Sequence, residues 1–216
     1  MASYPVASPR AGIWKYAKHF DAPGEQCRFT AGEGNTPFRP LLQIGKRFGF
    51  SDLWVKDESI QVGGSYKMRY GLCAAAHALE RGCKFIPGTS SGNAGIALSI
   101  ACRIAGIECR LAVVDTAPDD KINMLKACGA NLFIVDGFGT DPDVSTQTFD
   151  VVRQIAETAG TDIGVSSYTK NPAAMSAVMT MAFELAEQSD RPIDRIVVPA
   201  GAGGFALATA RGFKIA

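Results

Sequence analysis

The chain has 216 residues, of which 47% are apolar, so it can bury one large core or two small ones. Its charges nearly cancel, with 22 lysine and arginine residues against 21 acidic ones, and no basic run indicates a nucleic-acid surface. Six cysteines without a C-x-x-C pair, and only two histidines, favour reduced thiols over a metal site. Residues 1–10 lack the apolar core of a signal peptide, and no later segment is apolar over the length of a membrane span. These features predict a cytoplasmic protein that binds neither nucleic acid nor membrane.

From residue 50 onward, short apolar segments alternate with longer segments of helical period, which predicts an α/β fold with a parallel sheet. The expected strands occupy residues 53–56, 84–90, 108–114, 131–137, 162–167 and 193–199. The expected helices occupy residues 66–82, 93–106, 119–129, 144–159 and 172–188, and a last helix starts within residues 201–216. Residues 137–143 cluster glycine, proline and aspartate, and they are the expected domain hinge.

The first unusual strand-to-helix junction is residues 59–67, which places Lys67 in the first turn of a helix. Gly63 and Gly64 permit turn conformations that other residues avoid, and Ser65 can cap the helix. The positive end of the helix dipole opposes a cation at this position but favours a neutral amine, which can attack a carbonyl group. An ordinary surface lysine above a flexible turn is the alternative interpretation.

The second junction is residues 88–95, where small residues precede an alanine-rich helix. Unobstructed backbone N–H groups at such a turn suit a carboxylate or a phosphate. Ser90 and Ser91 add hydroxyl donors, and Asn93 offers an amide that can reach a phenolic or carboxylate oxygen. The alternative is an ordinary helix cap made by Ser91 or Asn93.

The third junction joins the expected strand 193–199 to the run Gly201, Ala202, Gly203 and Gly204. A glycine-rich turn that opens a helix can hold a phosphate group through backbone N–H groups. The dinucleotide fingerprint is rejected, because it requires a βαβ unit and an acidic residue about 20 positions further on. A glycine turn for close helix packing is the remaining alternative.

Together, the three junctions offer a lysine for an imine, an amide for a ring hydroxyl and a loop for a phosphate ester, which pyridoxal 5′-phosphate requires. The order of the motifs resembles the fold type II pyridoxal-phosphate enzymes, which belong to the tryptophan synthase beta superfamily. Several of the motifs look like those of the threonine synthases and their close relatives. The motifs are GIWKY, GEGNTPF, LWVKDES, GGSYK and APDDKINMLKACGANLFIVDG, in this order along the chain.

The resemblance implies two parallel-sheet, three-layer αβα domains. Residues 50–140 would form a small, substrate-gripping domain, and residues 1–49 plus 141–216 a large cofactor domain. Members of the family extend further, so the second domain is expected to be incomplete and truncated at its carboxyl end. The group that faces the pyridine nitrogen would then be missing.

The resemblance also implies a role for each junction. Lys67 would form the imine and act as the catalytic base, and Asn93 would donate to the ring oxygen of the cofactor. The residues expected to hold the phosphate are Gly201, Ala202, Gly203 and Gly204, and those expected to bind the substrate carboxylate are Ser90, Ser91 and Gly92. The sequence departs from the family beside the lysine, where relatives carry Asn-Pro-Thr before the turn and Asp-Arg after it. Here these flanks are Gln61–Val62–Gly63 and Met68–Arg69.

The activity that the resemblance implies is a lyase of amino-acid biosynthesis, working as a homodimer on a small amino acid. A threonine synthase-like enzyme would combine γ-elimination and β-replacement on a phosphohomoserine-type substrate. A cysteine synthase-like or dehydratase-like β-replacement or β-elimination is one alternative. A truncated, non-catalytic remnant that acts as a binding module is the other.

Overall fold

The computed structural model describes residues 12–216, so the stretch 1–10, for which no signal peptide is expected, lies outside the described residues. Among the helices that it describes, none combines the length and apolar character needed to cross a bilayer. The α-helices are α1 (Leu42–Phe48), α2 (Lys67–Glu80), α3 (Asn93–Ala105), α4 (Asp119–Ala127), α5 (Pro142–Ala159), α6 (Pro172–Ser176), α7 (Thr180–Gln188) and α8 (Gly204–Ile215). The strands are β1 (Phe38–Pro40), β2 (Trp54–Lys56), β3 (Phe85–Thr89), β4 (Glu108–Val114) and β5 (Ala130–Val135). Short 3-10 helices are η1 (Gly12–His19), η2 (Glu25–Cys27), η3 (Glu58–Ile60) and η4 (Ala177–Met179).

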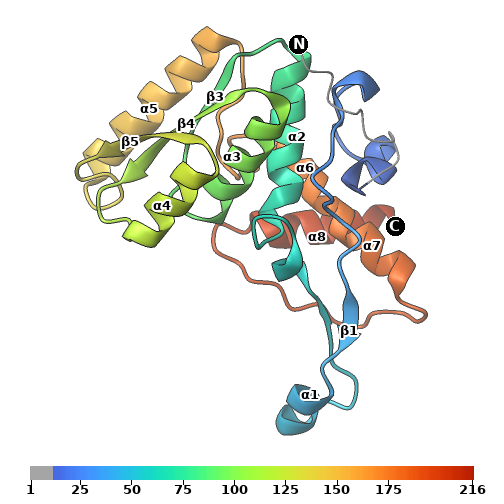
Figure 1. Ribbon diagram of the computed structural model, residues 1–216. Helices are drawn as coiled ribbons and strands as arrows, with labels where there is room; N and C mark the ends of the chain where they lie inside the picture. The colour runs from blue at the N-terminus through green and yellow to red at the C-terminus, as the bar shows by residue number, and fades with distance from the viewer. Residues whose placement is uncertain (1–11) are drawn as a thin grey trace.

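A parallel sheet in the order β3-β4-β5 forms the centre of one part of the molecule (Figure 1). Its register aligns Gly88 with Leu111 and Leu111 with Leu132. Helices α3 and α4 cover one face of the sheet and α5 covers the other. Consecutive strand residues point to opposite faces, so Leu111 and Val113 belong to one hydrophobic cluster and Ala112 to the other. The predicted α/β class with a parallel sheet is therefore confirmed.

A short extended segment, residues 162–165, adds to the free edge of β3. Gly164 pairs in parallel with Gly88, and its N–H donates to the carbonyl oxygen of Pro87 at 2.7 Å. A Cβ atom on Gly88 would overlap the carbonyl oxygen of Gly164, so this close approach requires glycine. The expected strand 162–167 is reduced to this single pairing.

Helix α2 is the central element and lies between the sheet and helices α6 to α8 (Figure 1). Residues 68–78 of α2 are all buried, which explains why the helix is rich in small residues on every side. Its tightest contact is with α3, where a Cβ atom on Gly71 would lie 2.7 Å from the backbone of Ala97. The helix that begins with Lys67 is thus held rigidly in the core.

Three sequence expectations differ from the structure. Strand β2 pairs with β1 as an antiparallel hairpin outside the parallel sheet, and the expected helix 172–188 is divided into α6, η4 and α7. The expected strand 193–199 does not form within residues 12–216; the segment is largely exposed, and Val197 is 97% accessible. An apolar sequence favours a strand, but a strand also needs a neighbour for its backbone hydrogen bonds.

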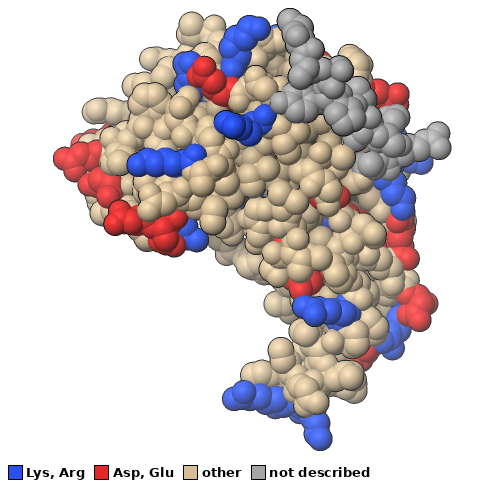
Figure 2. All heavy atoms as spheres, viewed as in Figure 1, with Lys and Arg blue, Asp and Glu red and all other residues tan. Residues whose placement is uncertain are grey.

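The β1–β2 hairpin and α1 form a lobe that projects from the rest of the molecule (Figure 1). Figure 2 shows lysine and arginine side chains at the end of this lobe, where α1 carries Lys46 and Arg47. On the same face, acidic side chains gather over α4 and the turn before α5. Elsewhere on this face, positive and negative side chains are mixed.

Candidate active site

Lys67 is the first residue of α2 and is partly buried. Its amine lies 2.7 Å from the hydroxyl of Ser166 and 4.8 Å from the ring centre of Tyr66. The side chain of Lys67 therefore contacts Ser166 and Tyr66. This differs from the alternative interpretation, in which Lys67 is an ordinary surface lysine.

Ser166 is a residue that the sequence analysis did not single out. Gly88, one residue before the end of β3, pairs in parallel with Gly164, so Ser166 follows this pairing at the carboxyl edge of β3, where Ser90 also lies. The amine of Lys67 thus lies at the carboxyl edge of β3, beside the turn of the second junction. The available signal was position: Ser166 is near the end of an expected strand, and ligands bind at such ends.

The turn between β3 and α3 has a different cap from the one considered in the sequence. Ser90 Oγ accepts hydrogen bonds from the N–H groups of Gly92 at 3.2 Å and Gly95 at 3.0 Å. Within residues 12–216, the side chains of Ser91 and Asn93 make no hydrogen bond to the protein, and Asn93 is exposed. Ser90 therefore stabilises the turn, and the polar groups of Ser91 and Asn93 are available to a ligand.

The glycine turn before α8 lies next to the lysine turn. Phe205, the second residue of α8, stacks on Tyr66 with ring centres 4.1 Å apart. Gly203 has a left-handed backbone with φ of 77°, and no side chain of the described residues caps the helix. Gly201 and Ala202 are exposed, while Gly203 and Gly204 are partly buried. The uncapped N–H groups of α8 thus lie close to the start of α2.

A buried charge network fixes the beginning of α2, and sequence reasoning missed it. Arg69 is fully buried and bonds to both carboxylate oxygens of Glu58, at 2.8 and 2.9 Å, and of Glu184, at 2.6 and 2.9 Å. Lys56 donates to Glu184 at 2.6 Å. Burial alone would raise the pKa of Glu184, but the bonds from Arg69 and Lys56 lower it from 4.5 to about 2. The network therefore connects η3, α2 and α7 through charged groups held ionised.

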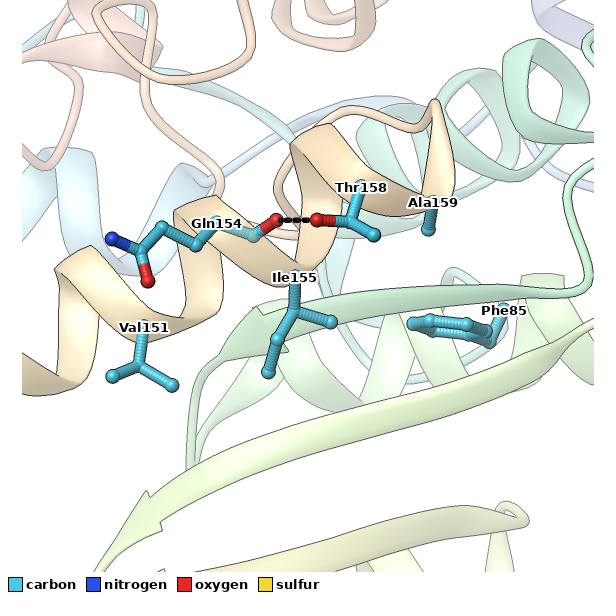
Figure 3. A pocket seen from close by; sticks show the side chains of 6 residues that line it. All are labelled: Phe85, Val151, Gln154, Ile155, Thr158 and Ala159. Atoms are coloured by element: carbon cyan, nitrogen blue, oxygen red, sulfur yellow. Dashed lines mark hydrogen bonds between the residues drawn. The ribbon is translucent and has the colours of Figure 1, made fainter.

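Two cavities border α5, and neither is lined by Lys67 or Ser166. A cavity of about 480 Å³ borders one side of α5 and includes Phe85, the first residue of β3 (Figure 3). Its wall is mainly apolar, and the hydroxyl of Thr158 donates to the backbone carbonyl oxygen of Gln154 at 2.8 Å. Because Phe85 marks the amino end of β3, this cavity lies at the edge of the sheet opposite Ser90 and does not include Lys67.

The family to which the chain belongs follows from comparison with known proteins. The sequence pattern of the family described as "Pyridoxal-phosphate dependent enzyme" matches residues 29–216. The chain belongs to this pyridoxal-phosphate family. The resemblance to fold type II enzymes and to threonine synthases is thus confirmed.

Relatives within the family have several different activities. A threonine synthase of Methanosarcina acetivorans is 30% identical, over 94% of this chain and 48% of that protein. A cysteine synthase of Aquifex aeolicus is 29% identical, over 94% of this chain and 63% of its own length. A crystal structure of a pyridoxal 5′-phosphate-dependent aspartate racemase superposes with a TM-score of 0.70 at 28% identity, over 83% of this chain and 54% of that one. The chain thus spans about half the length of the threonine synthase that it matches.

The residues of the candidate site fit the cofactor of the pyridoxal-phosphate family. An amine at a helix start, within hydrogen-bond distance of a neutral hydroxyl, suits attachment to an aldehyde. The uncapped start of α8, where Gly201 has open space around the position of a Cβ atom, suits a phosphate group. The Tyr66–Phe205 stack brings these two features together.

Proposed function

We propose that this protein binds pyridoxal 5′-phosphate covalently through Lys67 and acts on a small amino acid. The observation that carries the proposal is the position of the Lys67 amine, 2.7 Å from Ser166 at the carboxyl edge of β3. Ser91 and Asn93 follow β3 at the same carboxyl edge, and the turn that contains Gly203 lies next to Tyr66, which supports the proposal. An amine and two turns suited to anions are therefore close together.

The residues of the chain have separate tasks in the proposed reaction. When bound, pyridoxal phosphate supplies an electron-withdrawing ring that stabilises negative charge at the α-carbon of the substrate. The amine of Lys67, when it is free, would take the proton from that α-carbon. Ser90, Ser91 and Gly92 would bind the substrate carboxylate, chiefly through the hydroxyl groups of Ser90 and Ser91, because the N–H of Gly92 already donates to Ser90. Asn93 would donate to the ring oxygen of the cofactor.

The phosphate of the cofactor has its own proposed binding turn. The N–H groups of Gly201, Ala202, Gly203 and Gly204 point away from any capping side chain of the described residues and would hold the phosphate. Holding the phosphate orients the aldehyde toward Lys67.

The substrate we propose is of the phosphohomoserine type, converted by a threonine synthase-like lyase reaction that combines γ-elimination and β-replacement. The similarity to threonine synthases over 94% of the chain supports this choice. The cysteine synthase of Aquifex aeolicus, similar over the same share of the chain, supports β-replacement or β-elimination on a serine-type substrate as the second candidate. Phosphate release from phosphohomoserine, compared with keto-acid release from serine or threonine, separates the two.

Three further points are part of the proposal. The small domain would cover residues 50–140, and the large cofactor domain would cover residues 1–49 and 141–216. The packing of α5 and of residues 162–165 on β3 favours a later boundary, near residue 165. The homodimer and the cytoplasmic location remain expectations from the family.

The test is whether Lys67 carries the cofactor. The purified protein is mixed with pyridoxal phosphate, scanned for the absorbance band of a lysine adduct, and reduced with borohydride to fix the adduct for mass spectrometry. We expect a band and a labelled Lys67 in the unmodified protein, and neither in Lys67→Ala. The matched control is Lys84→Ala, which removes an exposed lysine and should leave the band unchanged. Absence of a band in the unmodified protein would favour the non-catalytic binding module instead.

A further inference from the structure

Lys67 has a neutral partner in the structure. The hydroxyl of Ser166 lies 2.7 Å from Nζ, and Ser166 itself is partly buried. Within residues 12–216, no carboxylate lies within ion-pair distance of this amine. The group that accepts the side-chain hydrogen bond of Lys67 is therefore neutral.

A hydroxyl partner suits an amine that changes its charge. A serine hydroxyl can accept an N–H bond from an ammonium group and can donate to the lone pair of a neutral amine. A carboxylate would favour only the ammonium form, while the start of α2 opposes a cation. Ser166 can therefore hold Lys67 in both of the states that a catalytic amine passes through.

The segment that carries Ser166 is fixed on both sides. Before it, Gly164 is bonded to Pro87 of β3 at 2.7 Å. After it, the N–H of Asn171 donates to Ser167 O at 2.8 Å, and the Asn171 side chain donates to Ile163 O at 3.1 Å. Asn171 is only 2% exposed, so its backbone N–H and its side-chain amide bind the two ends of the segment from inside the core. The position of the hydroxyl is thus determined by buried contacts.

The lysine is fixed from its own side as well. Arg69, two residues further along α2, is held by the carboxylates of the partly buried Glu58 and the buried Glu184. Tyr66, one residue before the lysine, stacks on Phe205. Lys67 and Ser166 are thus each held in position by other contacts. Their 2.7 Å hydrogen bond follows from the packing of the two segments that carry them.

We propose that Ser166 is a positioning residue that holds the amine of Lys67 whenever the amine is not bonded to the cofactor. This inference rests on the proposed function. In the cofactor-free protein, the hydroxyl would hold the amine in one position, ready for the aldehyde of an arriving cofactor; their condensation would form a C=N bond and release the aldehyde oxygen as water. When the amine is free of the cofactor during the reaction, the same hydrogen bond would hold it in place to take the proton from the α-carbon of the substrate. Holding the amine in one place lowers the entropic cost of both steps.

The experiment compares Ser166→Ala with two matched variants. Ser167→Ala removes a neighbouring hydroxyl that contacts Thr169 at 2.9 Å and not Lys67, and Ser166→Thr keeps a hydroxyl at the position. Two rates are measured for each: formation of the borohydride-trapped Lys67 adduct with pyridoxal phosphate, and acetylation of Lys67 in the cofactor-free protein, read by peptide mass spectrometry. Circular dichroism confirms that each variant is folded.

We expect the two rates to move in opposite directions in Ser166→Ala. Adduct formation should slow about tenfold, the factor that corresponds to one lost hydrogen bond, while acetylation of the released amine should become faster. Ser167→Ala should match the unmodified protein, and Ser166→Thr should recover both rates.

Unchanged rates in Ser166→Ala, with a normal adduct in the unmodified protein, would overturn the role of Ser166 and leave the proposed function standing. Absence of any adduct in the unmodified protein would overturn the proposed function and the catalytic use of Ser166 with it. Acetylation in the cofactor-free protein then reports whether the contact itself exists. The two failures are thus distinguishable.

Discussion

Arg69 decides how firmly the candidate site is attached to the core. Its guanidinium group is fully buried and shared between Glu58 and Glu184, and Thr180 contributes a further bond at 3.0 Å. A buried arginine without partners would be very unfavourable, so the four groups depend on one another. From sequence alone, Arg69 was only a departure from the family's usual flank, because nothing local indicates that two distant glutamates converge on it.

We predict that Arg69→Met destabilises the protein strongly. The substitution keeps most of the apolar stem but leaves the carboxylates of the buried Glu184 and the partly buried Glu58 without their main partner, which costs about 3–5 kcal/mol of unfolding free energy. Urea unfolding followed by circular dichroism measures the loss. The matched control is Arg39→Met, because Arg39 is exposed and pairs with Asp57 at the surface; its unfolding free energy should stay close to that of the unmodified protein. Equal stability of the two variants would contradict the importance of the network.

At the level of secondary-structure elements, the contact between β3 and residues 162–165 connects the fold to the site. Gly88 and Gly164 approach so closely that neither position has room for a side chain; a Cβ atom on Gly164 would lie 2.6 Å from Leu98 Cδ2. This close approach determines the position of the segment that carries Ser166, and so the position of its hydroxyl beside Lys67. Two glycines in the sheet therefore position a serine that follows it.

We predict that Gly88→Ala displaces residues 162–167. The added methyl group overlaps the carbonyl oxygen of Gly164, so the segment must move away from β3, at a cost of about 1–3 kcal/mol. Hydrogen exchange measured by mass spectrometry should become faster in residues 162–167, and acetylation of Lys67 should increase. Gly24→Ala is the control, because the added methyl group meets only the end of the flexible Gln26 side chain. Unchanged exchange in residues 162–167 would show that the pairing does not position Ser166.

The elements that sequence predicted well are those with a strong local signal. Strand β4 has the predicted bounds, and helices α2, α3 and α4 end within two residues of the glycine stops at Gly82, Gly106 and Gly129. Helix α5 begins two residues earlier than expected, because Asp141 caps it and Pro142 is compatible with its first turn. The expected strand 193–199 was wrong because its apolar pattern has no neighbour to pair with within residues 12–216. Local pattern decides whether a segment is suited to a strand, and the neighbour decides whether the strand forms.

At the scale of the whole molecule, the proposed cofactor site joins two distant parts of the chain. Lys67 begins α2, whereas the proposed phosphate turn precedes α8 near the end of the described chain. The Tyr66–Phe205 stack is the direct contact between the two. A ligand that binds both Lys67 and the turn before α8 should therefore stabilise the folded protein against unfolding.

We predict that pyridoxal phosphate raises the thermal unfolding midpoint more than pyridoxal, which lacks the phosphate. At about one hundred times its dissociation constant, the cofactor should raise the midpoint by roughly 5–10 °C. Ala202→Asp places a carboxylate in the exposed turn and should abolish the difference between the two ligands by repelling the phosphate. Ala210→Asp, at an exposed position of α8, is the control and should keep the difference. Equal shifts by both ligands in the unmodified protein would contradict the proposed phosphate turn.

The sequence by itself determined the alternation of helices and strands, the helix ends and the three junctions, because periodicity, glycine and capping residues act over a few neighbouring positions. The tertiary structure alone decided that Ser166 meets Lys67, that Arg69 is buried between two glutamates, and that Ser90 caps α3. Those contacts depend on which surfaces pack together, and that choice is made by burial and close packing across the whole chain, which no short segment encodes.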